Sequence, residues 1–534
     1  MRAGQPTSWE GSSDGSYTRA MATSGIRSEL LEVLARRALT EDAARPEAVA
    51  RLHARGGRSA REQVAELVDP GSFVEYGRFV TAAQASKRSD DDLLDRTVAD
   101  GIVGGLATID GHQVAVLSYD YLVMAGTQGM RGHRKTDRLL DVIARLALPT
   151  VFFAAGGGGR PGDVDIPLVS ALDVTTFAAW ARLSGTVPRI AVVEDNCFAG
   201  NAVIAGCADL IVATPRASLG MGGPAMIAGG GLGYVAAAEV GPLEVMVANG
   251  VVDLAVDDGD AVDAARALLG YFLGPRDTLV AADQVPLRDA VPDGERTSYD
   301  VEAIVETIAD VDSVTVLRGG FAPELVTALG RIEGRTVGFV ANDTRRMAGA
   351  VTAAAGDKAA RFLQLCDAHG FPVVSLVDTP GMMVGAEAEQ TGLVRHTSRL
   401  LVAAAAMQVP LLGVVLRRGY GLGAQAMLGG STHEPLMTLA WPGAHLGAMG
   451  LEGAVRLSMR RELEAIADDA EREATVRELT AYAQAHSTAL NVARHFEIDD
   501  VIDPAETRGI LARLSDAAAR DGGLAGSGRT VDTW

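Results

Sequence analysis

The chain has 534 residues, 48% hydrophobic and 22% charged, which is enough to bury large cores and more than one average domain contains. Its 48 Lys and Arg residues against 68 Asp and Glu residues give a net charge of −20, which repels a phosphate backbone and argues against a nucleic-acid partner. The three cysteines, Cys197, Cys207 and Cys366, have no CxxC spacing. This excludes a four-cysteine zinc site and a disulfide framework, and it fits a reducing, cytoplasmic setting.

Two segments of distinct composition open the chain. Residues 1–26 are polar and lack the apolar centre of a signal peptide or membrane anchor, so we expect a disordered tail. Residues 27–95 are charged and predict a helical N-terminal segment, which ends in a short element within ELVDPGSFVEYGRF. No uncharged apolar run is long enough to span a bilayer, so we expect no membrane partner.

The remainder of the chain is an internal repeat. Its features recur at one offset of 223 residues (334 − 111, 358 − 135, 372 − 149 and 381 − 158). The matches are Asp110-Gly111 with Glu333-Gly334, Val114 with Val337, Met124 with Met347, Lys135 with Lys358, Pro149 with Pro372 and Gly158 with Gly381. After a slip of one residue the register continues, with Val187 matching Val409. The sequence therefore predicts a duplicated domain, with one copy over residues 96–312 and the other over 313–534.

Each copy predicts alternating strands and helices. In the second copy we expect strands over 334–342, 371–381 and 409–419, separated by helices over 357–370 and 393–408 and followed by a glycine-opened helix over 421–430. Continuous apolar strands that alternate with helices are typical of βαβ units. The predicted class is α/β, with a mostly parallel sheet in each copy.

Glycine-bearing turns follow two strands in each copy. They cover residues 156–159 and 199–202 in the first copy and 378–381 and 419–424 in the second. Such turns present backbone N–H groups that can hold a developing oxyanion, although a glycine after a strand is usually only a tight turn. Neither GxGxxG nor GxxxxGK[ST] occurs at these turns, so a dinucleotide or P-loop site has no support.

The chain resembles the carboxyltransferase (β) subunits of biotin-dependent acyl-CoA carboxylases over about residues 30 to 515. The segments that carry the resemblance are LVDPGSFVEYGRFV, the run from GRTVGFVAN to SLVDTPGMMVG, GLVRHTSRLLVAAAA, AWPGAHLGAMGLEGAV and DDVIDPAETRGIL. The family implies a tandem duplication of crotonase-like domains, with acyl-CoA held by the first half and carboxybiotin by the second half of another subunit. It also implies a homohexamer and an α subunit that carries biotin carboxylase and the biotin carrier.

The resemblance explains why no catalytic triad or carboxylate pair is evident. In this chemistry the substrates supply the base, and the protein excludes water, aligns the reactants and stabilises two oxyanions by backbone donors. The family's donors for the thioester oxygen fall on Ala199 and Gly200, and those for the ureido oxygen fall on Leu422 and Gly423. At Gly423 we expect proline to remove a donor and alanine to be much milder.

Further substrate-binding residues follow from the same resemblance. The family's SGGAR turn falls on Gly157, Gly158, Gly159 and Arg160 in the altered form GGGGR. Gly381 belongs to the matching turn of the second copy. Gln425 stands where family members often have an Asp that helps to select short acyl groups, so this position does not identify the substrate.

Other residues have structural alternatives. Lys135 and Lys358 are candidates for CoA phosphate contacts, with a solvated helix face paired to Asp as the equal alternative. The Arg395-His396 pair is interpreted as packing, because the nine histidines show no metal-ligand spacing and no metal is expected. Residues 461–479 predict a charged helix at an interface or surface.

Two other functions stay open. The chain could serve a biotin-dependent decarboxylase or transcarboxylase, which runs the same half-reaction in the other direction, or it could be a non-catalytic relative that binds acyl-CoA. A lysine flanked by methionines, the biotin attachment motif, is absent from the chain, so biotin is expected on a partner.

Overall fold

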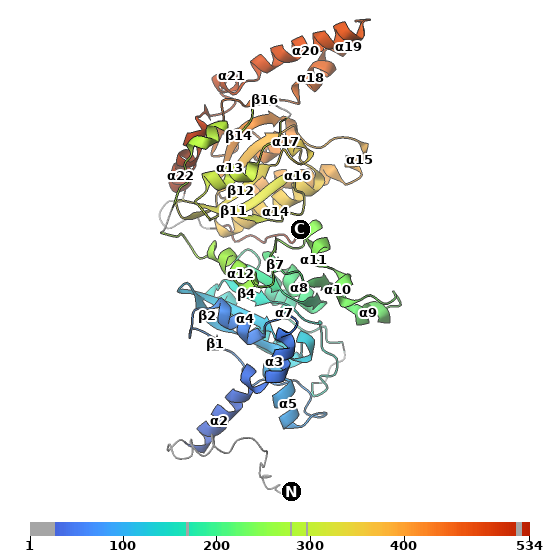
Figure 1. Cartoon of the computed structure of the whole chain (residues 1–534), viewed down its shortest axis with the longest axis vertical. Helices are drawn as coiled ribbons and strands as arrows, with labels where there is room; N and C mark the ends of the chain where they lie inside the picture. Colours follow the sequence, from blue (N-terminus) through green and yellow to red (C-terminus); the bar gives the residue numbers. More distant parts are fainter. Residues whose placement is uncertain (1–26, 167–169, 278–279, 295–296, 519–525) are drawn as a thin grey trace.

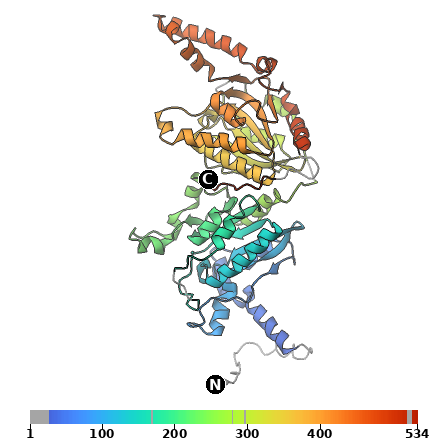
Figure 2. The same ribbon diagram turned by 180° about the vertical axis from the view of Figure 1, so that it is seen from behind.

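The computed structural model describes residues 27–166, 170–277, 280–294, 297–518 and 526–534. The tail expected over residues 1–26 lies outside this part of the chain. Two α/β bodies are stacked along the long axis, with α2 at one end and α18 to α20 standing away from the other, as both views show (Figures 1 and 2). No helix in the described ranges is long and apolar enough to cross a membrane.

The first body contains a seven-stranded sheet with the order β1-β2-β3-β4-β5-β7-β9. The strands are β1 (Val74–Glu75), β2 (Ile102–Ile109), β3 (His112–Tyr119), β4 (Thr150–Phe153), β5 (Arg189–Val193), β7 (Leu210–Ala213) and β9 (Leu254–Ala255). Pairing is antiparallel from β1 to β3 and parallel from β3 onward. A separate parallel pair, β6 (Asn196–Phe198) and β8 (Ser218–Gly220), lies beyond the end of β5.

The second body repeats this topology with the order β10-β11-β12-β13-β14-β15-β17, and β16 pairs with the end of β14. The strands are β10 (Thr315–Leu317), β11 (Leu325–Ile332), β12 (Arg335–Asn342), β13 (Val373–Thr379), β14 (Leu411–Tyr420), β15 (Met437–Ala440), β16 (His445–Gly447) and β17 (Asp500–Val501). In each body a two-residue turn with positive φ at both positions joins the antiparallel hairpin, at Asp110-Gly111 and at Glu333-Gly334. The predicted α/β class and duplication are confirmed.

The helices of the first body surround its sheet. They are α2 (Ser28–Leu39), α3 (Pro46–His53), α4 (Ala60–Leu67), α5 (Asp90–Arg96), α6 (Met130–Leu146), α7 (Thr176–Ala181), α8 (Gly200–Gly206), α9 (Pro224–Gly229), α10 (Ala237–Val240), α11 (Leu243–Ala248) and α12 (Ala261–Gly270). The short 3-10 turns of this body are η1 (Asp42–Ala44), η2 (Val98–Gly101) and η3 (Met124–Gly126), and the next one in the chain is η4 (Val285–Asp289).

The second body has its own set of helices. They are α13 (Val301–Ile308), α14 (Ala353–His369), α15 (Ala386–Glu389), α16 (Leu393–Ala406), α17 (Gly421–Met427), α18 (Leu451–Ser458), α19 (Arg460–Glu464), α20 (Asp469–His486), α21 (Ala489–Arg494) and α22 (Thr507–Ala518), with the 3-10 turns η5 (Met347–Gly349) and η6 (Pro504–Glu506). The η4 turn and α13 pack in the core of this body, ahead of the boundary expected at 312.

The two bodies share a hydrophobic core. One cluster joins Val116 and Leu269 of the first body to Ala359 and Phe362 of α14 in the second. Because α14 contacts its own sheet, α16 and the first body, it is buried almost all round, whereas its counterpart α6 keeps one exposed face. The additional burial of α14 comes from its contact with the first body.

Candidate active site

The structure brings the two glycine-bearing turns of the first body together. The turn 156–159 follows β4, and α8 begins after β6 at Gly200. Gly156 pairs with Cys197 of β6 in an isolated parallel bridge. A Cβ placed on Gly158 would lie 2.7 Å from the Cβ of Ala199 and 3.7 Å from the nitrogen of Gly200. Only glycine fits at 158, which also has φ +85°.

Most backbone donors of the turn 156–159 are already used. The N–H of Gly157 donates to the carbonyl of Ala125 over 3.1 Å, and that of Gly158 donates to Oδ1 of Asn201 over 2.9 Å. Among the hydrogen bonds of the described residues, none starts from the N–H of Gly159. Nothing lies within 4 Å of a Cβ placed on Gly159, so this residue borders open space.

On the neighbouring turn, the backbone N–H groups of Ala199 and Gly200 differ in whether they have an acceptor. The N–H of Ala199 donates to the carbonyl of Gly220 over 3.0 Å, so it is not free for a substrate oxygen. Gly200 is the first residue of α8, and its N–H has no acceptor within the described part of the chain. The expected donor pair at Ala199 and Gly200 is therefore corrected: the unpaired N–H groups are those of Gly159 and Gly200.

The second body repeats this arrangement. The carbonyl of Gly381 accepts from Val351 over 3.1 Å, as the carbonyl of Gly158 accepts from Gln128 over 2.7 Å. Met382 therefore occupies the position of Gly159 (382 − 159 = 223), and no acceptor for its N–H is found in the described ranges.

Beside Met382, α17 begins at Gly421, with Leu422 and Gly423 as its next two residues. The side chain of Leu422 is 65% exposed, while Gly423 is buried. A Cβ on Gly423 would lie 2.4 Å from the carbonyl carbon of Gly381 and 2.7 Å from the nitrogen of Met382. The expectation that alanine is mild at 423 is wrong, because its methyl group would push into the backbone of the facing turn.

Asparagines that the sequence did not single out hold the turns in place. In the first body, Asn201 is fully buried and its Nδ2 donates to the carbonyl of Gly126 over 3.3 Å. In the second body, Nδ2 of Asn342 donates over 3.1 Å to the carbonyl of Gly349, which is the counterpart of Gly126. The two asparagines come from different elements, α8 and β12, so no repeat in the sequence pointed to them.

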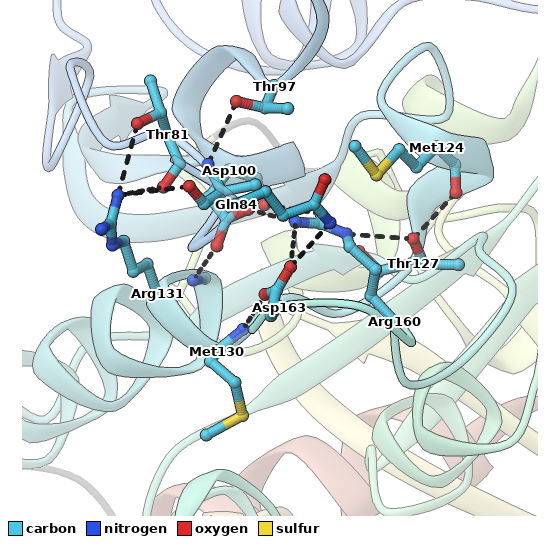
Figure 3. A network of polar contacts seen from close by, with 12 residues as sticks. Thr81, Gln84, Thr97, Asp100, Met124, Thr127, Met130, Arg131, Arg160 and Asp163 are labelled. Atoms are coloured by element: carbon cyan, nitrogen blue, oxygen red, sulfur yellow. Dashed lines mark hydrogen bonds and ion pairs between the residues drawn. The ribbon is translucent and has the colours of Figure 1, made fainter. Parts of the chain in front are cut away.

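The Arg160 side chain is part of a buried ion network. Its guanidinium contacts Asp100, lies 3.8 Å from Asp163 and donates to the carbonyl of Thr127 over 3.0 Å (Figure 3). The Asp163 carboxylate also accepts from the N–H of Met130 at the start of α6 over 2.9 Å. The side chain is 2% exposed, so the expected substrate contact of Arg160 is replaced by a positioning role.

Lys135 and Lys358 are also buried. Nζ of Lys135 donates to the carbonyl of Ile102, and Nζ of Lys358 donates to those of Phe321 and Leu325 over 2.8 and 2.7 Å. Burial lowers the pKa of Lys135 to about 8 and that of Lys358 to about 7. Both ammonium groups are engaged by these carbonyls, whereas the Gln425 side chain is exposed on α17.

Behind the second turn lies a fully buried carboxylate, Asp378. It accepts from Nε of Arg417 over 3.0 Å, from Nε of Arg418 over 2.6 Å and from the Tyr299 hydroxyl over 2.8 Å. Burial and this carboxylate raise the pKa of Tyr299. Since Asp378 precedes the turn, these contacts fix where β13 ends and where Gly381 and Met382 lie.

Two stacked α/β bodies, each with paired backbone-donor turns at the carboxyl ends of its parallel strands, define a duplicated crotonase-type fold that can hold two oxyanions. The chain belongs to the carboxyl transferase family, whose domain model matches residues 51–521. It is a carboxyltransferase of the biotin-dependent acyl-CoA carboxylase class.

Relatives from several bacteria support this membership. The chain is 34% identical over 477 residues to the methylmalonyl-CoA carboxyltransferase 12S subunit of Propionibacterium freudenreichii, covering 87% of this chain and 89% of that protein. It is 31% identical to the biotin-dependent long chain acyl-coenzyme A carboxylase beta4 subunit of Mycobacterium tuberculosis, covering 92% and 94% of the two chains.

Solved structures agree with the fold. The transcarboxylase 12S hexamer, with methylmalonyl-CoA bound, superposes with a TM-score of 0.81 at 30% identity over 94% of this chain and 99% of that one. A single-chain, multi-domain long-chain acyl-CoA carboxylase superposes with a TM-score of 0.87 at 50% identity. That match covers 92% of this chain and 49% of the multi-domain protein.

Proposed function

We propose that this chain transfers the carboxyl group of carboxybiotin, carried by a partner biotin carboxylase and biotin carrier subunit, to the α-carbon of a long-chain acyl-CoA. The observation that carries this proposal is the pair of unpaired N–H groups at Gly159 and Gly200 in the first body, with the unpaired N–H of Met382 and the start of α17 at the equivalent places in the second. The long-chain class is supported by 50% identity to the single-chain long-chain acyl-CoA carboxylase and by similarity to the mycobacterial long-chain subunit.

In this reaction the chain's own residues stabilise charge. The N–H groups of Gly159 and Gly200 hold the thioester oxygen as it becomes an enolate, and those of Met382 and Leu422 hold the ureido oxygen. Each preorganised donor typically contributes about 3 to 4 kcal/mol to barrier lowering. Carboxybiotin supplies the CO2 and the base that removes the α-proton, so the chain needs no general base and no metal.

We also propose that six copies of this chain assemble into a homohexamer. The structure of the similar 12S subunit is described as a hexamer. Several large apolar side chains of the second body stand exposed on the single chain, namely Met347, Val384, Val394 and Leu422. A second copy that covers them would complete each site across subunits. Six chains of 55.4 kDa should scatter light as a particle of roughly 330 kDa.

The test is carboxylation by the chain assembled with its biotin carboxylase and carrier. ATP- and bicarbonate-dependent product formation is measured with acyl-CoAs from acetyl-CoA to palmitoyl-CoA, and we expect turnover with a maximum among long chains. Binding of acyl-CoA without turnover of any of them would identify a non-catalytic relative.

Transcarboxylation is the second candidate, because the 12S subunit of a methylmalonyl-CoA carboxyltransferase is 34% identical. Backbone N–H donors stabilise the same two oxyanions whether the carboxyl group moves to the acyl-CoA or from it to the biotin carrier. Carboxyl transfer from methylmalonyl-CoA to the carrier without ATP, at a rate above that of the ATP-dependent reaction, would favour it.

A further inference from the structure

A pocket of about 440 Å³ opens on the second body beside the Met382 turn. Its walls are mostly apolar and include Phe321, Ala353, Ala354, Met383, Leu393 and Trp534. Met383 directly follows Met382, and the first two residues of α14 form the adjoining wall. A pocket of this size is within the range that holds an organic ligand.

At the equivalent place the first body carries longer side chains and a covering segment of its own chain. Ala353, Ala354 and Met383 correspond to Met130, Arg131 and Arg160, at the same offset of 223 (353 − 130, 354 − 131, 383 − 160). There Nη1 of Arg131 donates to the carbonyls of Thr81 and Ala82, both over 3.2 Å, and so holds residues 81–84 across this place (Figure 3).

Segment 81–84 is also fixed from its other end. Nε2 of Gln84 donates to Asp163 over 2.9 Å, close to the Arg160 network (Figure 3). In the second body small alanines replace the long side chains of Met130 and Arg131, and Phe321 and Trp534 line the pocket instead. The second copy therefore carries a pocket where, in the first copy, the Arg131 side chain holds residues 81–84.

The polar groups of the pocket are already satisfied. The Asp357 carboxylate lies 2.6 Å from Nδ1 of His396 and accepts a hydrogen bond from Nη1 of Arg399 over 2.9 Å. The Thr391 hydroxyl donates to the carbonyl of Ala388 over 2.6 Å, and the Thr352 hydroxyl donates to Glu324. A ligand with many hydrogen-bonding groups would find few partners here, while a hydrocarbon chain would lose little by leaving water.

One wall comes from the segment 526–534. Val531 is buried and its backbone exchanges two hydrogen bonds of 3.0 Å with the hydroxyl of Ser184. Asp532 pairs with Arg399 over 2.7 Å. The ring of Trp534 then lies 5.5 Å from that of Phe321, between centroids, and remains 41% exposed toward the pocket.

We propose that this pocket binds the hydrocarbon tail of a long-chain acyl-CoA and that Trp534 and Phe321 form the wall against which the tail packs. The inference rests on the proposed function: carboxyl transfer requires the α-carbon to reach the second turn, so the rest of the acyl chain must find space beside that turn. The pocket next to Met383 supplies apolar space there.

The test compares acyl-CoAs of 3 to 16 carbons by kcat/KM in the assembled holoenzyme. Ala388 also lines the pocket, and Ala388→Trp fills it. Trp534→Ala removes a wall, and Val402→Ala on the exposed outer face of α16 is the matched control. We expect Ala388→Trp to lower kcat/KM for palmitoyl-CoA at least tenfold while propionyl-CoA stays within about twofold. Trp534→Ala should flatten the rise of kcat/KM with chain length, which is about fourfold for each buried methylene.

The outcomes separate the two proposals. If no acyl-CoA is carboxylated by the unchanged protein, the proposed function fails. If carboxylation occurs and both pocket variants match Val402→Ala at every chain length, the tail pocket is refuted while the function stands. An equal loss at every chain length would overturn the tail pocket in favour of the carrier arm of carboxybiotin. Melting curves check that Ala388→Trp folds, and Trp534→Ala decides the question if it does not.

Discussion

Lys135 and Lys358 donate hydrogen bonds to equivalent carbonyl oxygens, those of Ile102 and Leu325. The two carbonyls, like the two lysines, are 223 residues apart (325 − 102 and 358 − 135). Each lysine thus joins a long helix to the first residue of the hairpin strand that it covers. This contact has been kept in both copies although the helices around it now lie in different environments, which supports the overlay expected from the repeat.

The buried lysines should give the protein a distinctive dependence of stability on pH. Burial lowers the pKa of Lys358 to about 7, whereas an unfolded lysine titrates near about 10.4. Between these values the unfolded state binds more protons, so the free energy of unfolding rises with pH by up to about 1.4 kcal/mol per pH unit. Below pH 7 both states hold the proton and this contribution is constant.

Lys358→Met should remove that slope. The measurement is urea unfolding between pH 7 and 9 for the variant and the parent, with Lys87→Met as a control at the third lysine of the chain. Parallel curves for Lys358→Met and the parent would show that Lys358 keeps an ordinary pKa.

The repeat predicted the fold better than it predicted the site. Hydrophobic runs and residue matches at a constant offset can be read directly from the order of residues. The hairpins, α14 and the glycine-bearing turns could therefore be located from the sequence. The partners of Arg160 are Asp100 and Asp163, and the space beside it is closed by residues 81–84, which belong to an earlier segment of the chain. No pattern near GGGGR indicates that this segment covers Arg160, so the sequence alone predicts a substrate contact for an arginine that is buried.

The sequence also could not show which backbone N–H groups of the first body are free to hold the thioester oxygen. Ala199 and Gly200 are adjacent in sequence, and which N–H is free depends on the pairing of β6 with β8. That pairing engages Ala199 with Gly220. Asn201 holds the facing turn through Gly158, but it is the second residue of α8, and nothing near it in the sequence indicates that contact.

Arg361 should be a main link between the two bodies. It extends from α14 into the first body, where it donates to the carbonyl of Asp209 over 2.5 Å and lies 3.7 Å from Asp253. Burial lowers its pKa to about 10, so it stays charged at neutral pH. Removing one partner of a buried ion pair costs about 3 to 5 kcal/mol, and Asp253 keeps Arg318, so we expect the lower end.

Calorimetry of Arg361→Met checks this expectation. The melting temperature should fall, and the transition should broaden or divide as the bodies lose cooperativity. Arg460→Met breaks the exposed pair with Glu464 and should cost no more than about 1 kcal/mol. Equal effects of the two substitutions would mean that Arg361 contributes no coupling between the bodies.

Asn201 should affect catalysis without touching the substrate. Asn201→Ala leaves the N–H of Gly158 and the carbonyl of Gly126 buried without partners, at about 1 to 3 kcal/mol for each. The turn that carries Gly159 then loosens, and kcat should fall more than the affinity for acyl-CoA changes. Asn201→Asp keeps the acceptor for Gly158 and should retain more activity. A variant with normal kcat and lowered stability would limit Asn201 to a structural role.

Gly159 offers a cleaner test of a backbone donor than Gly423, because the structure leaves room at 159 and none at 423. Nothing lies within 4 Å of a Cβ at Gly159, and its φ is outside the left-handed region, so Gly159→Ala keeps both the fold and the N–H. Gly159→Pro removes the N–H while adding only a small ring. If this N–H holds the thioester oxygen, carboxyl transfer in Gly159→Pro should drop about a hundredfold or more, the typical cost of one lost donor, while Gly159→Ala stays near the parent.

The comparison is kcat of the assembled enzyme at saturating acyl-CoA, with melting temperature and particle mass confirming that both variants are intact. Matching rates for an intact proline variant and the alanine variant would remove Gly159 from the reaction and leave its turn a structural one.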